Sequence, residues 1–333
     1  MDEAVTHVDW ARPRRQDVPF SVPFALSAEK GKLWIAPVDE LHDGEIGVRD
    51  EDADDSPWSE LVLKGTNWAG FQSQTACPHV MWRDGDEGLT GRNMSEHVAF
   101  LQKNGFNAVR LPLNAWIVTW HLHPKNTAGP GGISTFGGDG QPYNTTFRCG
   151  DETGRPSMEI LDELILKLRD AGIFVMLDMH AIYSPVVAGE ENYSPSVRDV
   201  AYTAMISDAW AVLAQRYCAS PNVIMADIFN EPYAMDWMQW KAWIEIIGGR
   251  VQRICARWLI AVQGAKDTNQ YCWGEDISGQ RTAPIQLPVG NRLVMAPHTY
   301  GHFNFGCECH NPACLRSNPL SLASTRSLHG EGY

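Results

Sequence analysis

Segments with the pattern of buried β-strands alternate with helical segments along most of this 333-residue chain, and this alternation is its most constraining feature. Apolar strand segments that are each followed by an amphipathic helix are typical of parallel α/β folds. We expect strands at 61–67, 107–112, 173–180, 223–229, 259–262 and 292–300, and helices at 94–104, 157–171, 197–217 and 238–258. The sequence therefore predicts an α/β architecture with a parallel sheet.

Polar residues collect at the carboxyl ends of these strands. Arg110 comes just before the proline that ends its strand, His180 closes the strand at 173–180, and Asn230 and Glu231 follow the strand at 223–229. In an α/β barrel these strand ends meet on one face, where catalytic residues are placed. The pattern favours a (β/α)8 TIM-barrel type over an open sheet.

The stretch from Val223 to Pro232 is apolar up to Phe229, apart from Asp227, and then turns polar. It predicts a strand covered on both faces that delivers a carboxylate to its tip. Partial burial of Glu231 would favour its protonated form, which a general acid needs. An ordinary strand-ending acid, hydrogen-bonded to loop amides, remains the alternative for this residue.

The chain divides at an acidic run, 50–55, which we interpret as a solvated linker. We expect residues 1–56 to form an N-terminal extension that caps the barrel, with a possible edge strand at 32–36, and residues 57–333 to form the barrel domain. Ser157 is expected to cap the helix that begins there. Two long segments, 113–156 and 181–195, have the length of functional loops.

Composition excludes some classes of partner. A formal net charge of −13 argues against nucleic acid and anionic membranes as partners. The sequence contains no run of eighteen apolar residues, so it predicts no membrane-spanning helix. The first twenty residues contain no apolar signal-peptide region, so either the protein is intracellular or its native start lies elsewhere. Eight scattered cysteines define no disulfide scaffold and leave the compartment open.

Six segments together resemble the retaining glycoside hydrolases of family 5, the cellulase and mannanase family. They occur in the order of that family, between about residues 61 and 305. The segments are 63–68, 104–112, 171–180, 228–232, 272–276 and 296–300. The resemblance implies a TIM barrel and an extracellular enzyme that acts on a polysaccharide or oligosaccharide and needs no cofactor.

The resemblance also implies roles for particular residues. Glu231 would be the catalytic acid/base, and Asn230 would bind the sugar 2-hydroxyl at an oxocarbenium-like transition state. Arg110 would lie beside the nucleophile and keep it ionised. The subsite around the cleaved bond would be lined by His180, His298 and Tyr300. On its own, each of these residues could equally be a structural residue of the barrel rim.

Flat aromatic rings cover the apolar faces of sugars, so some of the thirteen tryptophans are expected to bind substrate. The candidates that flank matching segments are Trp68, Trp82 and Trp273. By contrast, Trp237, Trp240 and Trp243 have helical spacing and are expected to pack in the core.

The chain departs from the family pattern after Tyr300. The family takes its nucleophile from the seventh strand, in a Gly-Glu-aromatic-Gly type of motif, but the remaining residues contain no apolar strand. We therefore expect the barrel to be incomplete at its C-terminal end, with Glu331 a weak candidate nucleophile. The same tail holds Cys307, Cys309 and Cys314, for which a disulfide or free thiols are favoured over a zinc site.

The most favoured function is that of a retaining endo-β-1,4-glucanase. A β-mannanase or other β-glycanase is an alternative within the family. A catalytically dead carbohydrate-binding protein that lacks the nucleophile is the main rival, and a metal-dependent barrel hydrolase that uses His180, His298 and the cysteine-rich tail is a third possibility.

Overall fold

The computed structural model describes residues 20, 23–38, 57–73, 76–78, 93–119, 155–182, 200–232, 235–265 and 274–298. In this part of the chain a six-stranded parallel sheet has its strands in sequence order, β4-β5-β6-β7-β8-β9. The strands are β4 (Gly65–Asn67), β5 (Ala108–Asn114), β6 (Phe174–Ala181), β7 (Val223–Asp227), β8 (Leu259–Val262) and β9 (Leu293–Met295). Sequential parallel strands joined by helices are the arrangement of a (β/α)8 TIM-barrel type fold.

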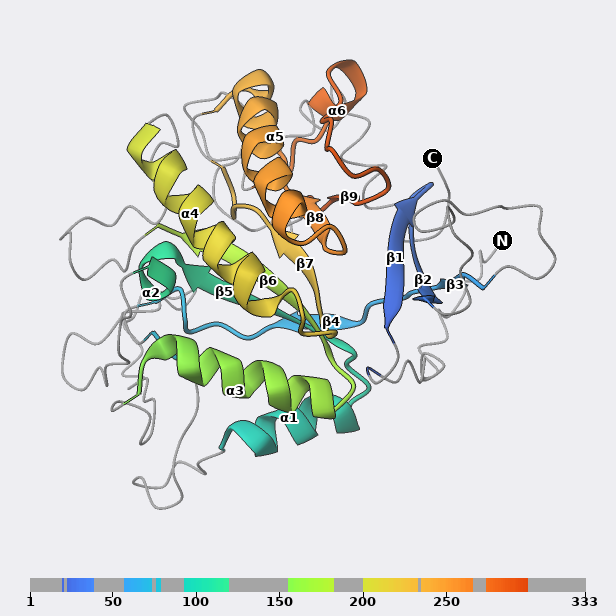
Figure 1. Ribbon diagram of the computed structural model, residues 1–333, viewed down its shortest axis with the longest axis vertical. Helices are drawn as coiled ribbons and strands as arrows, with labels where there is room; N and C mark the ends of the chain where they lie inside the picture. Colours follow the sequence, from blue (N-terminus) through green and yellow to red (C-terminus); the bar gives the residue numbers. More distant parts are fainter. Residues whose placement is uncertain are drawn as a thin grey trace, which may run out of the picture.

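Four long helices cover the outer side of these strands (Figure 1). They are α1 (Met94–Lys103), α3 (Ser157–Asp170), α4 (Val200–Tyr217) and α5 (Trp237–Ile254), and the short helices are α2 (Ala115–Thr119) and α6 (Gly279–Thr282). The predicted alternation of strands and helices is confirmed. Some local predictions were wrong. Helix α2 lies in the segment expected to be a loop, and Pro156 rather than Ser157 is the N-cap residue of α3. Pro112 does not end its strand, because β5 continues to Asn114.

Side chains of the strands alternate between two apolar layers. One set faces the helices, and its members on the central strands include Val109, Leu111, Val175, Leu177, Ile260 and Val262. The other set faces the barrel interior and includes Phe174, Met225, Leu259 and Ala261, and Ile224 joins it where the register between β6 and β7 shifts by one residue. Because successive strand residues point to opposite faces, counting by two along each strand identifies the residues that share the barrel interior.

The N-terminal hairpin closes one end of that interior. The strands β1 (Phe24–Glu29) and β2 (Lys32–Pro37) are joined by Lys30 and Gly31, both at positive φ, as a tight two-residue hairpin turn requires. Phe24 packs edge-on against Phe174 at the start of β6. Strand β2 also pairs with β3 (Ser59–Glu60), so it is the middle strand of three and not the edge strand that the sequence suggested.

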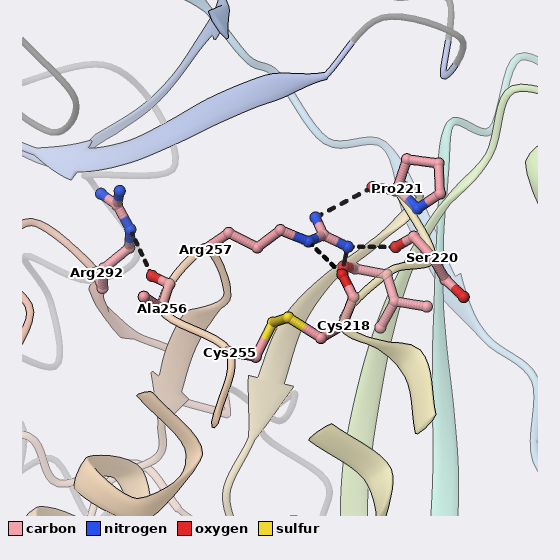
Figure 2. The surroundings of a disulfide bond; sticks show 8 residues. Cys218, Ser220, Pro221, Cys255, Ala256, Arg257 and Arg292 are labelled. Atoms are coloured by element: carbon pink, nitrogen blue, oxygen red, sulfur yellow. Dashed lines mark hydrogen bonds between the residues drawn. A yellow bond between two sulfur atoms is a disulfide. The ribbon is translucent and has the colours of Figure 1, made fainter. Parts of the chain in front are cut away.

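A disulfide bond that the sequence did not predict joins Cys218, after α4, to Cys255, after α5 (Figure 2). Beside it, the Arg257 guanidinium donates hydrogen bonds to the carbonyl oxygens of Cys218 at 2.7 Å and Val223 at 2.8 Å. Burial lowers the pKa of Arg257 to about 10. The disulfide and Arg257 together link the turn before β7 to the turn before β8.

Two tryptophans fasten the opposite, carboxyl ends of the same strands. The indole Nε1 of Trp210 on α4 donates to the carbonyl oxygen of Ile228 at 3.0 Å, and that of Trp240 on α5 donates to the carbonyl oxygen of Gln263 at 2.9 Å. Both rings are fully buried. Trp240 and Trp243 pack in the core, as their spacing predicted. The described helices include none that is long and apolar enough to cross a bilayer.

We predict that replacing both Cys218 and Cys255 by serine destabilises the fold. The bridged residues are 37 positions apart. A disulfide that closes a loop of that length lowers the conformational entropy of the unfolded chain and so raises the free energy of unfolding by about 2–4 kcal/mol. The melting temperature should fall by about 3–6 °C in differential scanning calorimetry. A reductant should lower the melting temperature of the wild type more than that of the variant. An unchanged melting temperature in the variant would contradict this account.

Candidate active site

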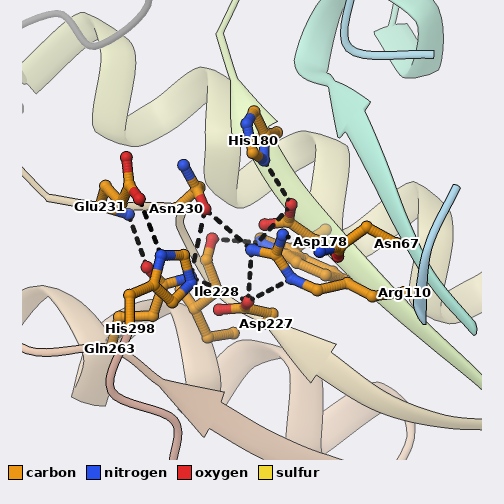
Figure 3. A network of polar contacts seen from close by, with 11 residues as sticks. Asn67, Arg110, Asp178, His180, Asp227, Ile228, Asn230, Glu231, Gln263 and His298 are labelled. Carbon is orange, nitrogen blue, oxygen red and sulfur yellow. Dashed lines mark hydrogen bonds and ion pairs between the residues drawn. The ribbon is translucent and has the colours of Figure 1, made fainter. Parts of the chain in front are cut away.

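The polar strand ends converge at the carboxyl end of the sheet (Figure 3). The residues involved continue the interior-facing positions of their strands: Arg110 on β5, Asp178 and His180 on β6, Asp227 on β7 and Gln263 just after β8. Asn230 and Glu231 follow β7, and His298 follows β9. Five segments that are far apart in sequence therefore contribute to one polar cluster.

Arg110 lies at the centre of this cluster. Its Nη2 is 2.9 Å from Asp178 Oδ2 and 2.9 Å from Asp227 Oδ2, and its Nε donates to the same Asp227 oxygen at 3.1 Å. The strand register accounts for this arrangement, because Asp178 and Asp227 are direct partners across β6 and β7. One guanidinium thus bridges two carboxylates that the sheet places side by side.

Both carboxylates are almost completely buried, with side-chain exposures of 0% for Asp178 and 2% for Asp227. Burial raises the pKa of Asp227, and the neighbouring Asp178 adds to this effect, while Arg110 and Gln263 oppose it. Burial alone would lower the pKa of Arg110, but the charges of Asp178 and Asp227 outweigh it and the pKa is raised. Arg110 is therefore a permanent cation inside the barrel.

Asn230 is oriented by the same guanidinium. Its Oδ1 accepts a hydrogen bond from Arg110 Nη2 at 2.8 Å and a longer one from Gln263 Nε2 at 3.5 Å. Since the acceptor oxygen is fixed toward Arg110, the Nδ2 donor faces away from it (Figure 3). A hydrogen-bond donor of defined direction therefore lies beside Glu231.

Glu231 is held by both its backbone and its side chain. Its φ of 47° lies in the left-handed region, which costs a residue other than glycine about 1–2 kcal/mol. Its N–H donates to Gln263 Oε1 at 2.7 Å, and its Oε1 is 2.8 Å from His298 Nδ1. With 14% of the side chain exposed, the carboxyl group is largely shielded but still open to solvent. Such a group can exchange a proton with a bound molecule.

His180 is attached to the other side of the cluster. Its Nδ1 lies 2.7 Å from Asp178 Oδ2, and 27% of its side chain is exposed. A carboxylate that accepts from Nδ1–H fixes the orientation of an imidazole ring and leaves Nε2 directed outward. His180 can therefore offer Nε2 to a ligand at the strand ends.

The structure brings together five of the site residues predicted from the sequence: Arg110, His180, Asn230, Glu231 and His298. The backbone N–H of Trp68 donates to the carbonyl oxygen of Arg110 at 3.0 Å, but only 8% of Trp68 is exposed and its ring packs 5.2 Å from that of His97. This position favours a packing role for Trp68. Trp82, Trp273, Tyr300, Glu331 and the cysteines at 307, 309 and 314 lie outside the described residues.

Sequence reasoning missed three members of the cluster: Asp178, Asp227 and Gln263. A signal for the first two was available, since Asp178 is two residues before His180 and Asp227 is the one polar residue in an apolar strand. For Gln263, counting by two from Leu259 and Ala261 places it on the interior face. The described residues contain no group of three side chains suited to hold a metal ion.

The raised pKa of Asp227 predicts a specific pH dependence of stability. An aspartate in the unfolded chain titrates near pH 4, whereas Asp227 in the folded protein has a higher pKa. Between these two pKa values the folded state binds more protons than the unfolded state. The contribution of Asp227 to stability is therefore complete at acidic pH and is lost as the pH rises through this window. The stability advantage of the wild type over Asp227→Asn should shrink as the pH rises above about 4 and through the folded pKa of Asp227. Melting temperatures measured across this range test the claim, and an advantage that grows with pH would contradict it.

Comparisons with known proteins agree with the fold and identify the family. A family model described as Cellulase (glycosyl hydrolase family 5) matches residues 60–323. An endoglucanase of Paenibacillus polymyxa is 28% identical over 262 residues, which are 74% of this chain and 58% of that protein. The major extracellular endoglucanase of Xanthomonas campestris pv. campestris is 31% identical over 261 residues, 72% of this chain and 46% of that protein. This chain thus spans about half the length of these relatives.

Solved structures show the same fold. An endocellulase of the archaeon Pyrococcus horikoshii is similar with a TM-score of 0.64 at 23% identity, over 92% of this chain and 78% of that one. The catalytic domain of the Xanthomonas endoglucanase is similar with a TM-score of 0.59 at 25% identity, over 79% and 71% of the two chains. Given the barrel-type sheet, the polar cluster at its carboxyl end and the match over 60–323, the chain belongs to the cellulase family, glycosyl hydrolase family 5.

Proposed function

We propose that the protein is a retaining endo-β-1,4-glucanase that uses Glu231 as its acid/base. The observation that carries the proposal is the position of Glu231, which is partly exposed at the carboxyl end of β7 and contacts His298, with Asn230 and Arg110 beside it. Family membership supports hydrolysis of a glycosidic bond, and the names of the Paenibacillus and Xanthomonas relatives support a β-glucan as substrate.

In the proposed first step, Glu231 donates its proton to the glycosidic oxygen while a second carboxylate attacks the anomeric carbon. The bond to the leaving sugar breaks and a covalent glycosyl-enzyme forms. In the second step, Glu231 as carboxylate removes a proton from water, which attacks the same carbon and releases the second carboxylate. We assign the nucleophile to no described residue, because Asp178 and Asp227 are buried and bound to Arg110.

The other cluster residues have supporting roles in this proposal. The Nδ2 of Asn230 faces away from Arg110 and would donate to the 2-hydroxyl of the sugar at the cleaved bond, a contact that strengthens in the transition state. His298 would hold the carboxyl group of Glu231 in its working orientation. His180, oriented by Asp178, and Tyr300 would contact the same sugar. The fixed charge of Arg110 would favour an ionised nucleophile nearby.

The proposed location is extracellular. Structural disulfides form and persist mainly in oxidising compartments, and the bond between Cys218 and Cys255 supports such a location. The Xanthomonas relative is itself named an extracellular endoglucanase.

We predict that Glu231→Gln lowers kcat on a soluble β-1,4-glucan by about 10²–10⁴-fold, because general acid catalysis contributes that much. An aryl cellobioside with a strongly acidic leaving group needs no proton, so its cleavage to the glycosyl-enzyme should suffer much less. The matched control is Glu159→Gln, a change at an exposed glutamate of α3 that should leave both rates unchanged. Glu231 is also the base of the second step, so the comparison uses kcat/KM, which reports the steps up to formation of the glycosyl-enzyme. Equal losses of kcat/KM on both substrates would contradict an acid role for Glu231.

The product distribution separates the proposed enzyme from its rivals. An endo-acting retaining enzyme should lower the viscosity of a soluble β-glucan well before much reducing sugar accumulates, and proton NMR should show β-configured products first. Cellotetraose binding without any turnover would instead support a carbohydrate-binding protein that lacks a nucleophile. Faster cleavage of mannan than of glucan would move the assignment to β-mannanase.

A further inference from the structure

The side chain of Gln263 is completely buried between Asp227 and Glu231, at the first position after β8. Its Oε1 accepts the backbone N–H of Glu231 at 2.7 Å, and its Nε2 donates to Asp227 Oδ2 at 2.9 Å. The two contacts fix the orientation of the amide, because a peptide N–H only donates and an ionised carboxylate only accepts. Gln263 is thus the direct link between Glu231 and the ion-pair cluster.

The surrounding structure holds this side chain in place. The carbonyl oxygen of Gln263 accepts from the indole of Trp240, which fixes the backbone at the end of β8. Gly274, at a φ of 77°, lies directly over the amide, and a Cβ at that position would be 2.8 Å from Gln263 Oε1. A larger residue at this position would therefore press on the carboxamide of Gln263, and the positive φ also favours glycine there.

The partner that Gln263 binds has an unusual conformation. Glu231 is one of four residues other than glycine with positive φ among the described residues. The N–H of Glu231 does not pair with a neighbouring strand, and it donates instead to Gln263 Oε1. The same conformation directs the Glu231 carboxyl group to His298.

We propose that Gln263 is a positioning residue for the acid/base, and this inference rests on the proposed function. Its carboxamide holds the backbone of Glu231 in the left-handed conformation and ties it to Asp227, which Arg110 binds in turn. Gln263 acts through Glu231 and not on the sugar. Its loss should therefore affect kcat, through the placement of the proton donor, more than KM.

The test compares two buried glutamines. Gln263→Met keeps the length of the side chain and removes its two short hydrogen bonds, to Glu231 and Asp227, together with the longer one to Asn230. The matched control is Gln252→Met on α5, where a glutamine that is 2% exposed also makes two hydrogen bonds, both to the backbone of Val289. A role in folding alone should lower the melting temperature in both variants and change kcat in neither.

With Gln263→Met we expect kcat on soluble β-1,4-glucan to fall by about 10–100-fold with KM changed by less than about threefold, since misplacing a catalytic group by about 1 Å has effects of this size. Gln252→Met should retain kcat within about twofold. If the two variants have the same kcat, the positioning role is overturned.

Gln263→Glu provides a rescue test. A protonated glutamic acid can accept from the Glu231 N–H and donate its O–H to Asp227, whereas an ionised one places a second negative charge beside Asp227. The charged and titratable groups near this position are Arg110, Asp178, Asp227, Glu231 and His298. Gln263→Glu should therefore recover at acidic pH most of the activity that Gln263→Met loses, and its activity relative to wild type should decline as the pH rises. A loss as deep as that of Gln263→Met at every pH would contradict the proposal.

Hydrogen exchange of the Glu231 amide supplies a readout that does not depend on activity. Gln263→Met should accelerate this exchange at least about tenfold, and Gln252→Met should leave it unchanged, because only the first variant removes the acceptor of that N–H. If the wild type hydrolyses no β-glycan, the proposed function fails, and exchange at Glu231 still decides whether Gln263 holds the residue. Unchanged exchange in Gln263→Met overturns the inference.

Discussion

The ion pairs of Arg110 with Asp178 and Asp227 are the interaction on which the site depends. The parallel register places the two aspartates side by side in the barrel, where two carboxylates without a counter-charge would be strongly unfavourable. A single guanidinium compensates both and also orients Asn230. Removing one partner of a buried ion pair typically costs about 3–5 kcal/mol, because the remaining charge is left unpaired. The same contacts therefore stabilise the barrel interior and set the direction of the groups at its mouth.

The helices keep this arrangement rigid from outside the barrel. Trp210 and Trp240 each donate an indole hydrogen bond to a carbonyl oxygen at the end of β7 or β8, and these strand ends carry Glu231 and Gln263. At the opposite end of the same strands, Arg257 and the disulfide between Cys218 and Cys255 connect the incoming turns. Each of the two central strands is thus fixed at both ends. Catalytic groups on rigid elements retain the geometry that proton transfer requires.

The sequence predicts much of this architecture because strand and helix periodicity depend on local residue order. The bounds of the strand at 259–262 and of the helix from Met94 were predicted to within a residue. The carboxyl ends of parallel strands meet on one face, and this correctly predicted that Arg110, His180, Asn230, Glu231 and His298 lie together. Other features depend on contacts distant in sequence. The register between β6 and β7 makes Asp178 and Asp227 neighbours, and the approach of α4 to α5 makes the disulfide possible. Neither the left-handed backbone of Glu231 nor the burial of Trp68 can be read from composition or spacing.

The central claim is that these strand ends bind one sugar ring with Glu231 at the cleaved bond. A crystal structure of the Glu231→Gln protein with cellotetraose tests this most directly. We expect the glycosidic oxygen to lie about 3 Å from the carboxamide of residue 231, which is hydrogen-bond distance, and the 2-hydroxyl of the adjoining sugar to meet Asn230 Nδ2. An oligosaccharide that binds away from the carboxyl ends of β5 to β8, with neither contact made, would contradict the account.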